Sequence, residues 1–404
     1  MPEQRDVIIV GAGPAGSALA YFLAARGLDV LLLDKSAFPR DKTCGDGLSP
    51  RAMHVLRAMG LLDPLLAVGW KINNILLFAP NGRPISAPVP PYDGLPNFAL
   101  VLPRLQLDDL IRAQAAKAGA EFRSQFNVTD LMREGNQFVG VRATTPDGPR
   151  ELRAPLSVLA TGASVGLLER ADLLAAPPAF GRAARTYYEG MRGLSDTVEF
   201  HFDSVPLPGY GWVFPISPTA ANVGAGYFVR AGKPPMRNSP RQVMDDFIAS
   251  PYVANMLDGA HPAAPPKGYP LRFDFPTART AFPGLALVGE ACGLVNPLTG
   301  EGIDYALESA EVAAEVLGDA LRCGEASALT AQRYYQALRD RFLRTFVNIG
   351  RVRDLYIQGW VLNRFAAAAN HNKDLKLLLI HIALGNIDPI RALSPKTLLQ
   401  VAMG

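Results

Sequence analysis

Cysteine and net charge are both scarce in this 404-residue chain. The three cysteines, Cys44, Cys292 and Cys323, form no CxxC pair and are too few for a disulfide framework, so we expect a reducing compartment. The formal charge of +3 gives no indication of a nucleic-acid partner. No apolar run reaches the ~18 residues of a membrane span, and no signal-peptide pattern begins the chain. These absences predict a cytoplasmic protein.

Metal-ligand patterns and repeats are also missing. The five histidines have no ligand spacing, so we expect no metal site. With 49% hydrophobic residues, the chain is long enough to bury a large core in two or three domains.

The chain begins with a β-α-β pattern. Residues 6–10 and 30–33 are short apolar runs typical of buried parallel strands, and residues 17–26 between them have helical spacing. Further along, residues 71–90 and 198–229 are proline-rich and β-like. We also expect helices at 105–111 and 302–321, and short strands near positions 128, 139, 158 and 285–288.

A glycine-rich turn joins the first strand to the first helix. Its G-x-G-x-x-G spacing gives a tight turn at Gly11, close approach of a pyrophosphate at Gly13, and helix–strand packing at Gly16. The acid that ends the second strand, Asp34, is placed to accept hydrogen bonds from ribose hydroxyls. The candidate nucleotide-binding residues are Gly11, Gly13, Ala15, Gly16, Asp34 and Lys35.

A second glycine-rich turn follows the strand at 285–288. Glu290 is placed to bind a ribityl hydroxyl, and a P-x-x-G-x-G pattern then opens a helix whose N-terminus would stabilise negative charge on a reduced flavin. The candidate ring-binding residues are Pro297, Gly300, Gly302 and Ile303. Two such turns predict FAD as the cofactor.

The order of these segments predicts an α/β (α+β) fold with a discontinuous, Rossmann-like FAD-binding domain. We expect this domain over residues 1–72, 98–175 and 275–328. An antiparallel β-sheet domain that binds the substrate is expected over 73–97 and 176–274, and a C-terminal helical region over 329–404.

Three stretches resemble the FAD-dependent oxidoreductases of the p-hydroxybenzoate hydroxylase fold. They are residues 38–50, with Cys-Gly-Asp-Gly, residues 207–215, with Tyr-Gly-Trp-Val-Phe-Pro, and residues 296–305. Within this fold the chain most resembles the geranylgeranyl reductase family, and the bacterial menaquinone reductases in particular. The resemblance implies that Arg104, Cys44 and Gly45 lie near the flavin and that the backbone of Val128 meets the adenine.

The resemblance also implies a reaction. Reduced flavin would deliver hydride to a C=C bond of a polyprenyl group, of geranylgeranyl or menaquinone type, and the catalytic candidates are Cys44, Tyr210 and Trp212. Cys44 or Tyr210 would supply the proton. Alternation along a strand would put Tyr210, Trp212 and Phe214 on one face as an aromatic wall, although Phe214 also suits ordinary core packing. Cys44 also suits the role of a small buried apolar residue.

Several alternatives remain open. Asp46 is a rival acid or a turn-former. The protein is otherwise a flavin monooxygenase, a hydroxylase or less readily a halogenase, acting on an aromatic or polyketide substrate. A third candidate is a redox-silent lipid carrier that contains FAD. The external electron donor is NAD(P)H or ferredoxin, and Thr161, where the hydroxylases have an acid, speaks against direct use of NAD(P)H.

The tail is basic, with 11 Lys/Arg against 4 Asp/Glu from position 331 onward. A basic amphipathic helix lies readily on a membrane surface, which would make the protein membrane-peripheral. The alternative is a helical cap that packs on the FAD-binding domain.

Overall fold

A six-stranded sheet lies at the centre of the nucleotide-binding part. The computed structural model describes residues 3–92, 94–229, 238–356 and 358–403. The order of strands in this sheet is β20 (Ala281–Phe282), β21 (Leu285–Leu287), β13 (Leu156–Leu159), β2 (Val7–Val10), β3 (Val30–Leu33) and β9 (Glu121–Arg123). All pairs are parallel except β20–β21. Every residue of β2, β3 and β13 is buried because both faces of the sheet are covered, and all of these residues except Ser157 are apolar.

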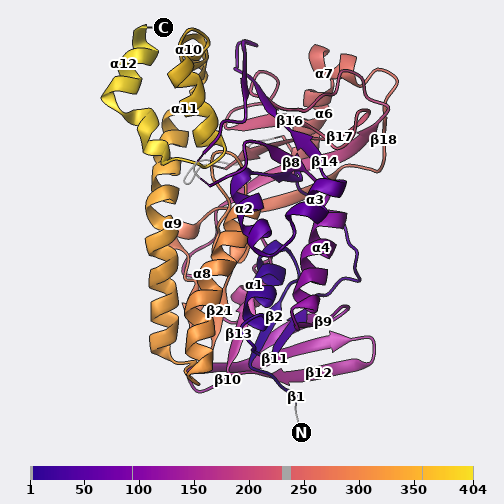
Figure 1. The fold of residues 1–404 in the computed structure, drawn as a ribbon, viewed down its shortest axis with the longest axis vertical. Helices are drawn as coiled ribbons and strands as arrows, with labels where there is room; N and C mark the ends of the chain where they lie inside the picture. Colours follow the sequence, from indigo (N-terminus) through magenta and orange to yellow (C-terminus); the bar gives the residue numbers. More distant parts are fainter. Residues whose placement is uncertain (1–2, 93, 230–237, 357, 404) are drawn as a thin grey trace.

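Helices α1 (Pro14–Ala24), α4 (Arg104–Lys117) and α8 (Ile303–Arg322) pack together beside this sheet, and the long helix α9 (Ala328–Tyr356) runs along α8 (Figure 1). The first helix begins at Pro14, before the expected position 17. Proline suits a first helical turn, where its missing N–H would have no partner anyway. Two shorter helices, α2 (Pro50–Ala58) and α3 (Leu62–Val68), come after β3 in the chain. A third, α5 (Gly166–Arg170), comes after β13.

Two small sheets flank the central one. The first contains β1 (Glu3–Gln4), β12 (Gly148–Arg153), β11 (Gln137–Thr145) and β10 (Asn127–Glu134), and β11 packs against β13. The second contains β4 (Gly47–Leu48), β8 (Ala99–Val101) and β5 (Trp70–Ile72). The strands expected near positions 128 and 139 therefore lie in a different sheet from the one near 158.

An eight-stranded, mostly antiparallel sheet is built from two separate stretches of the chain. Its order is β18 (His261–Pro262), β14 (Phe180–Glu189), β17 (Ala220–Phe228), β16 (Gly209–Pro215), β15 (Thr197–His201), β6 (Asn74–Phe78) and β7 (Pro84–Pro88), with β19 (Lys267–Arg272) also paired to β14. Helices α6 (Pro240–Ile248) and α7 (Pro251–Met256) cover one face, where Val213 and Phe247 share a buried cluster. The opposite face is left for a ligand cavity.

The predicted C-terminal helices are confirmed. After α9 come α10 (Gly359–His371), α11 (Lys373–Ala383), the short 3-10 helix η3 (Pro389–Leu393) and α12 (Pro395–Met403), gathered at one end of the molecule (Figure 1). Helix α9 packs on the nucleotide-binding part, but Phe365 of α10 and Leu375 of α11 form a core with Ala79 and Ile85 beside β6 and β7. No helix in the described ranges has the length and apolarity to cross a bilayer.

Candidate active site

A cavity of about 830 Å³ runs from the first glycine turn to the C-terminal helices. Most of the predicted site residues line it, namely Gly11, Gly13, Ala15, Asp34, Lys35, Cys44, Gly45, Arg104, Val128, Tyr210, Trp212, Glu290, Gly300, Gly302 and Ile303. Gly16 and Pro297 do not. A Cβ on Gly16 would lie 1.9 Å from the Gly11 carbonyl oxygen, so this glycine serves helix–strand packing.

The first turn forms an anion seat at one end of the cavity. Gly11 has a φ of +107°, and a Cβ there would lie 2.4 Å from the Ala160 carbonyl oxygen. Gly13 caps α1 without any side-chain hydrogen bond, which leaves helix N–H groups for a ligand. A Cβ on Gly13 would lie 3.8 Å from the guanidinium groups of both Arg40 and Arg104. Two cations and a free helix N-terminus suit a pyrophosphate.

Asp34 is fixed beside this seat. Its carboxylate accepts hydrogen bonds from the backbone N–H groups of Ala12 and Ser36, both at 2.9 Å, and lies 3.5 Å from Arg40. Arg40 is also paired with Asp108 at 2.9 Å. The sequence patterns did not single out Arg40, although it stands within the 38–50 stretch that carries the family resemblance.

Glu290 lies further along the cavity with its carboxylate held on both sides. One oxygen accepts a hydrogen bond from the Arg272 backbone N–H at 3.1 Å, and the other lies 3.5 Å from Lys42 Nζ. Burial is the largest influence on Lys42 and opposes its charge, but Glu290 together with smaller contributions from neighbouring groups raises the pKa of Lys42 overall. Lys42 also lies 3.9 Å from the centre of the Tyr269 ring. Neither Lys42 nor Tyr269 was expected from the sequence, because strand pairing alone brings β19 to this loop.

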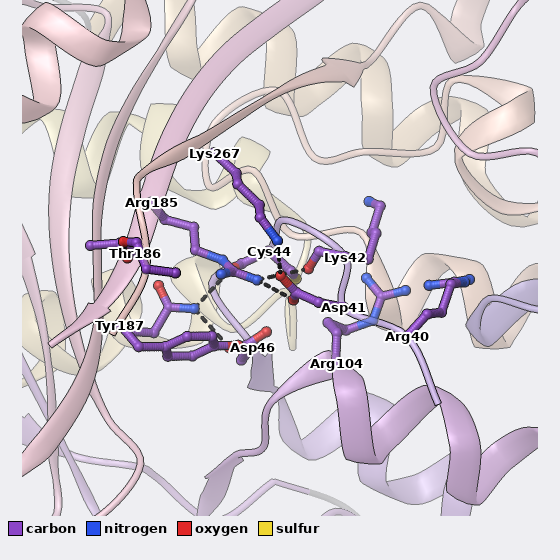
Figure 2. Close-up of polar contacts among 12 residues, drawn as sticks. Arg40, Asp41, Lys42, Cys44, Asp46, Arg104, Arg185, Thr186, Tyr187 and Lys267 are labelled. Carbon is purple, nitrogen blue, oxygen red and sulfur yellow. Dashed lines mark hydrogen bonds and ion pairs between the residues drawn. The ribbon is translucent and has the colours of Figure 1, made fainter. Parts of the chain in front are cut away.

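Salt bridges tie the loop that carries Cys44 to the antiparallel sheet. Asp41 lies 2.6 Å from Arg185 of β14 and 3.0 Å from Lys267 of β19, and both cations converge on it (Figure 2). On the other side of the loop, Cys44 interacts with the buried side chain of Arg104. Burial opposes the charge of Arg104, but Asp108 outweighs it and raises the pKa of the guanidinium. The loop thus holds Cys44 at the cavity wall.

Asp46 is more than a turn-former. It is fully buried with a left-handed φ of +67°, which Asp tolerates better than most residues. One carboxylate oxygen accepts hydrogen bonds from Tyr187 Oη at 2.6 Å and Asn222 Nδ2 at 2.7 Å, while the other has no partner among the described residues (Figure 2). Burial raises the pKa of Asp46 to about 6. No sequence pattern predicted that Tyr187 of β14 and Asn222 of β17 would contact this loop.

The expected aromatic wall is present, and its polar hydrogens are already in use. Tyr210, Trp212 and Phe214 all line the cavity, so Phe214 is not simply a core residue. Trp212 Nε1 donates to Asn222 Oδ1 at 2.9 Å, and Tyr210 Oη donates to the Thr299 carbonyl. Phe214 lies over the Cys44 loop, where a Cβ on Gly45 would meet its ring at 3.2 Å.

This donor set fits FAD: an uncapped helix N-terminus with two guanidiniums, an acid at the end of β3, a second acid at Glu290, and a second uncapped helix start at Gly302. The fold and the site define an FAD-dependent oxidoreductase. A family model described as an FAD binding domain matches residues 4–171. The chain belongs to the geranylgeranyl reductase family of these enzymes.

Two relatives document this membership, and a solved structure shares the fold. A menaquinone reductase from Mycolicibacterium smegmatis is 33% identical over 332 residues, covering 78% of this chain and 77% of the relative. Digeranylgeranylglycerophospholipid reductase 2 from Methanopyrus kandleri is 30% identical over 381 residues, covering 92% of each chain. The crystal structure of a geranylgeranyl bacteriochlorophyll reductase-like protein from Thermoplasma acidophilum shares the fold, with a TM-score of 0.82, 23% identity, and coverage of 94% of this chain and 96% of that one.

Proposed function

We propose that this enzyme saturates C=C bonds of a polyprenyl group, of geranylgeranyl or menaquinone type. The observation that supports this most is the apolar extension of the cavity beyond Cys44 and Tyr210. Its walls come from the antiparallel sheet and the C-terminal helices, and include Ile75, Leu77, Phe200, Phe202, Leu362, Phe365, Leu379 and Ile382. A long, branched hydrocarbon gains free energy by leaving water for such a surface. The relatives named menaquinone reductase and digeranylgeranylglycerophospholipid reductase support the same substrate class.

The residues of the chain divide the work of binding. We assign the ADP part of FAD to Gly11, Gly13 and Asp34, the ribityl chain to Glu290, and the ring to the residues from Gly300 to Ile303. When bound and reduced, FAD supplies a hydride. The wall of Tyr210, Trp212 and Phe214 keeps water from the path between the ring and the lipid.

The test is an anaerobic turnover in the absence of any other reductant. The flavin is photoreduced, candidate prenyl lipids are added, and mass spectrometry follows gains of two hydrogens while absorbance follows flavin reoxidation. We expect both signals together. A monooxygenase would leave the lipids unchanged in this test and would hydroxylate an aromatic compound when the reduced enzyme is exposed to oxygen. Lipid binding without flavin reoxidation would establish a carrier.

The electron donor is a separate part of the proposal. Thr161 lines the cavity, and its hydroxyl donates to the Ser164 carbonyl at 3.0 Å. Because no acid stands at this position, we expect reduced ferredoxin to reduce the bound FAD faster than NAD(P)H does. Stopped-flow absorbance with each donor measures this directly, and faster reduction by NAD(P)H would contradict it.

We also propose that the C-terminal helices touch a membrane surface. Trp360 on α10 is 67% exposed and Leu399 on α12 is 60% exposed. Exposed Arg364 on α10, Lys373 on α11 and Lys396 on α12 add positive charge, which anionic lipid headgroups would attract. Contact at this end would place the apolar branch of the cavity near its lipid supply.

A further inference from the structure

Glu301 lies in the segment assigned to the flavin ring, but its side chain has no role so far in the proposed reaction. It lines the cavity between Gly300 and Gly302, at the start of α8. No described residue forms a hydrogen bond or ion pair with its carboxyl group, and the hydrogen bonds of this residue involve only its backbone. The carboxyl therefore has its hydrogen-bonding capacity free for a ligand in the cavity.

The groups around Glu301 favour its protonated form. Burial raises the pKa of Glu301 well above its ordinary value, and the nearby Asp304 raises it further. Arg51 opposes this effect, but it lies 3.3 Å from Asp304 and is also paired with Glu308. Tyr210 interacts electrostatically with Glu301 and Cys44, and burial together with these two groups raises the pKa of Tyr210. A neutral carboxyl group at this place holds a proton that it can give up.

The other proton candidates are less free. The hydroxyl hydrogen of Tyr210 is bound to the Thr299 carbonyl, and the indole hydrogen of Trp212 is bound to Asn222. Cys44 interacts with the Arg104 guanidinium, which can only donate hydrogen bonds, so the sulfur acts as an acceptor in this contact. Glu301 also lines the cavity here, and no described residue accepts a hydrogen bond from its carboxyl group.

We propose that Glu301 is the acid that protonates the substrate carbon, a role that rests on the proposed reduction of a prenyl double bond. The hydride of reduced FAD forms a C–H bond at one alkene carbon, and the π electron pair takes the proton of Glu301 at the other. The flavin is oxidised by two electrons, the lipid is reduced by two, and the Glu301 carboxylate regains its proton from water. Tyr210 then acts as a positioning residue that holds the 299–301 turn.

The test compares Glu301→Gln with Glu311→Gln in single turnovers of the photoreduced enzyme. Glu311 lies on α8, which begins just after Glu301, and its pKa is raised to about 7 by burial, but it does not line the cavity. A well-placed general acid contributes roughly 10²–10⁴ in rate, so we expect that loss in Glu301→Gln and wild-type turnover in Glu311→Gln. The wild-type rate should fall as pH rises through the pKa of Glu301, and this fall should be absent from Glu301→Gln.

Two further measurements do not depend on turnover. Infrared spectroscopy of the FAD-bound protein at neutral pH should show a protonated carboxyl band that Glu301→Gln lacks and Glu311→Gln retains. Glu301→Asp, which keeps the acid on a shorter side chain, should restore part of the rate with its pH dependence. It also provides a second variant if the glutamine form loses its FAD.

The outcomes separate the two proposals. Full turnover in Glu301→Gln with an unchanged pH profile would overturn the role of Glu301 alone. Loss confined to Cys44→Ala would assign the proton to the thiol. A wild-type enzyme that reduces no prenyl lipid would overturn the proposed function and this role together.

Discussion

Single residues in this enzyme carry two different kinds of constraint. At Gly11 the constraint is steric, because a positive φ coincides with a backbone oxygen that fills the space of a side chain. At Asp46 the constraint is electrostatic, because a carboxylate is buried with one of its oxygens unpartnered among the described residues. The first shapes the nucleotide seat, and the second holds the loop that carries Cys44.

Gly11→Ala should destabilise the fold by on the order of 3 kcal/mol and abolish FAD retention, because the new Cβ would lie 2.4 Å from the Ala160 carbonyl oxygen. Gly82→Ala is the matched control, since Gly82 has a φ of +77° but open space around it. It should lose only about 1 kcal/mol and keep its flavin. Chemical denaturation and bound-flavin absorbance measure both effects. Equal losses in the two variants would show that φ, and not the contact, sets the cost.

Asp46 should make the stability of the protein depend on pH. Its folded pKa of about 6 lies above the ordinary value of 3.8, so the folded state binds the extra proton and stability falls as pH rises between these values. The loss amounts to up to about 3 kcal/mol above pH 6. Asp46→Asn keeps the side-chain shape and an acceptor for Tyr187, so it should remove this slope. Urea unfolding of both proteins across that range provides the test, and parallel pH profiles would contradict it.

Among the elements, helices α10 and α11 decide how far the apolar branch of the cavity extends. Leu362, Phe365 and Ala366 of α10 line it together with Leu379 and Ile382 of α11. They pack beside β6 and β7. The helical region thus forms part of the binding site and is not only a cover for the nucleotide-binding part.

Enlarging one side chain on α10 should shorten the accepted prenyl chain. Ala366→Phe fills space in the branch, so long polyprenyl substrates should lose about tenfold or more in kcat/KM while short prenyl substrates keep theirs. Ala367→Phe, at the neighbouring position that does not line the cavity, is the control. Steady-state kinetics over a series of chain lengths measures the effect. A uniform loss over all lengths would mean that the substitution disturbs folding or FAD binding instead.

At the scale of the whole molecule, the site exists only where three parts meet. The parallel sheet provides the nucleotide seat, the antiparallel sheet provides the aromatic wall, and the C-terminal helices close the apolar end. Helices α10 and α12, which carry the exposed Trp360 and Leu399, lie at that same end (Figure 1). A lipid leaving a membrane there would enter the branch that ends at the flavin.

Trp360→Ser combined with Leu399→Ser should weaken sedimentation with anionic phospholipid vesicles by about tenfold or more, since both exposed apolar contacts are lost. Added salt should weaken the wild-type protein as well, because the basic residues contribute. Turnover of detergent-dispersed substrate should stay unchanged. Val68→Ser, at a position 52% exposed on α3, is the control. Equal vesicle binding by all three proteins would contradict membrane contact at this end.

The amino-acid sequence alone was enough to predict the cofactor, the central strands and the two glycine-rich turns, because a glycine turn between a strand and a helix is specified by neighbouring residues. The first helix nevertheless begins at Pro14, before its expected position. It also placed Tyr210, Trp212 and Phe214 on one face, which follows from strand alternation alone.

Contacts between residues that are far apart in the sequence could be identified only from the tertiary structure. Tyr187 and Asn222 reach Asp46, and Lys42 reaches Glu290, through the pairing of strands far apart in the chain. The tertiary structure also brings α10 and α11 to the cavity, and it brings Glu301 close enough to Tyr210 to interact with it electrostatically. Such contacts depend on sheet order and helix packing, and no local pattern of residues encodes either.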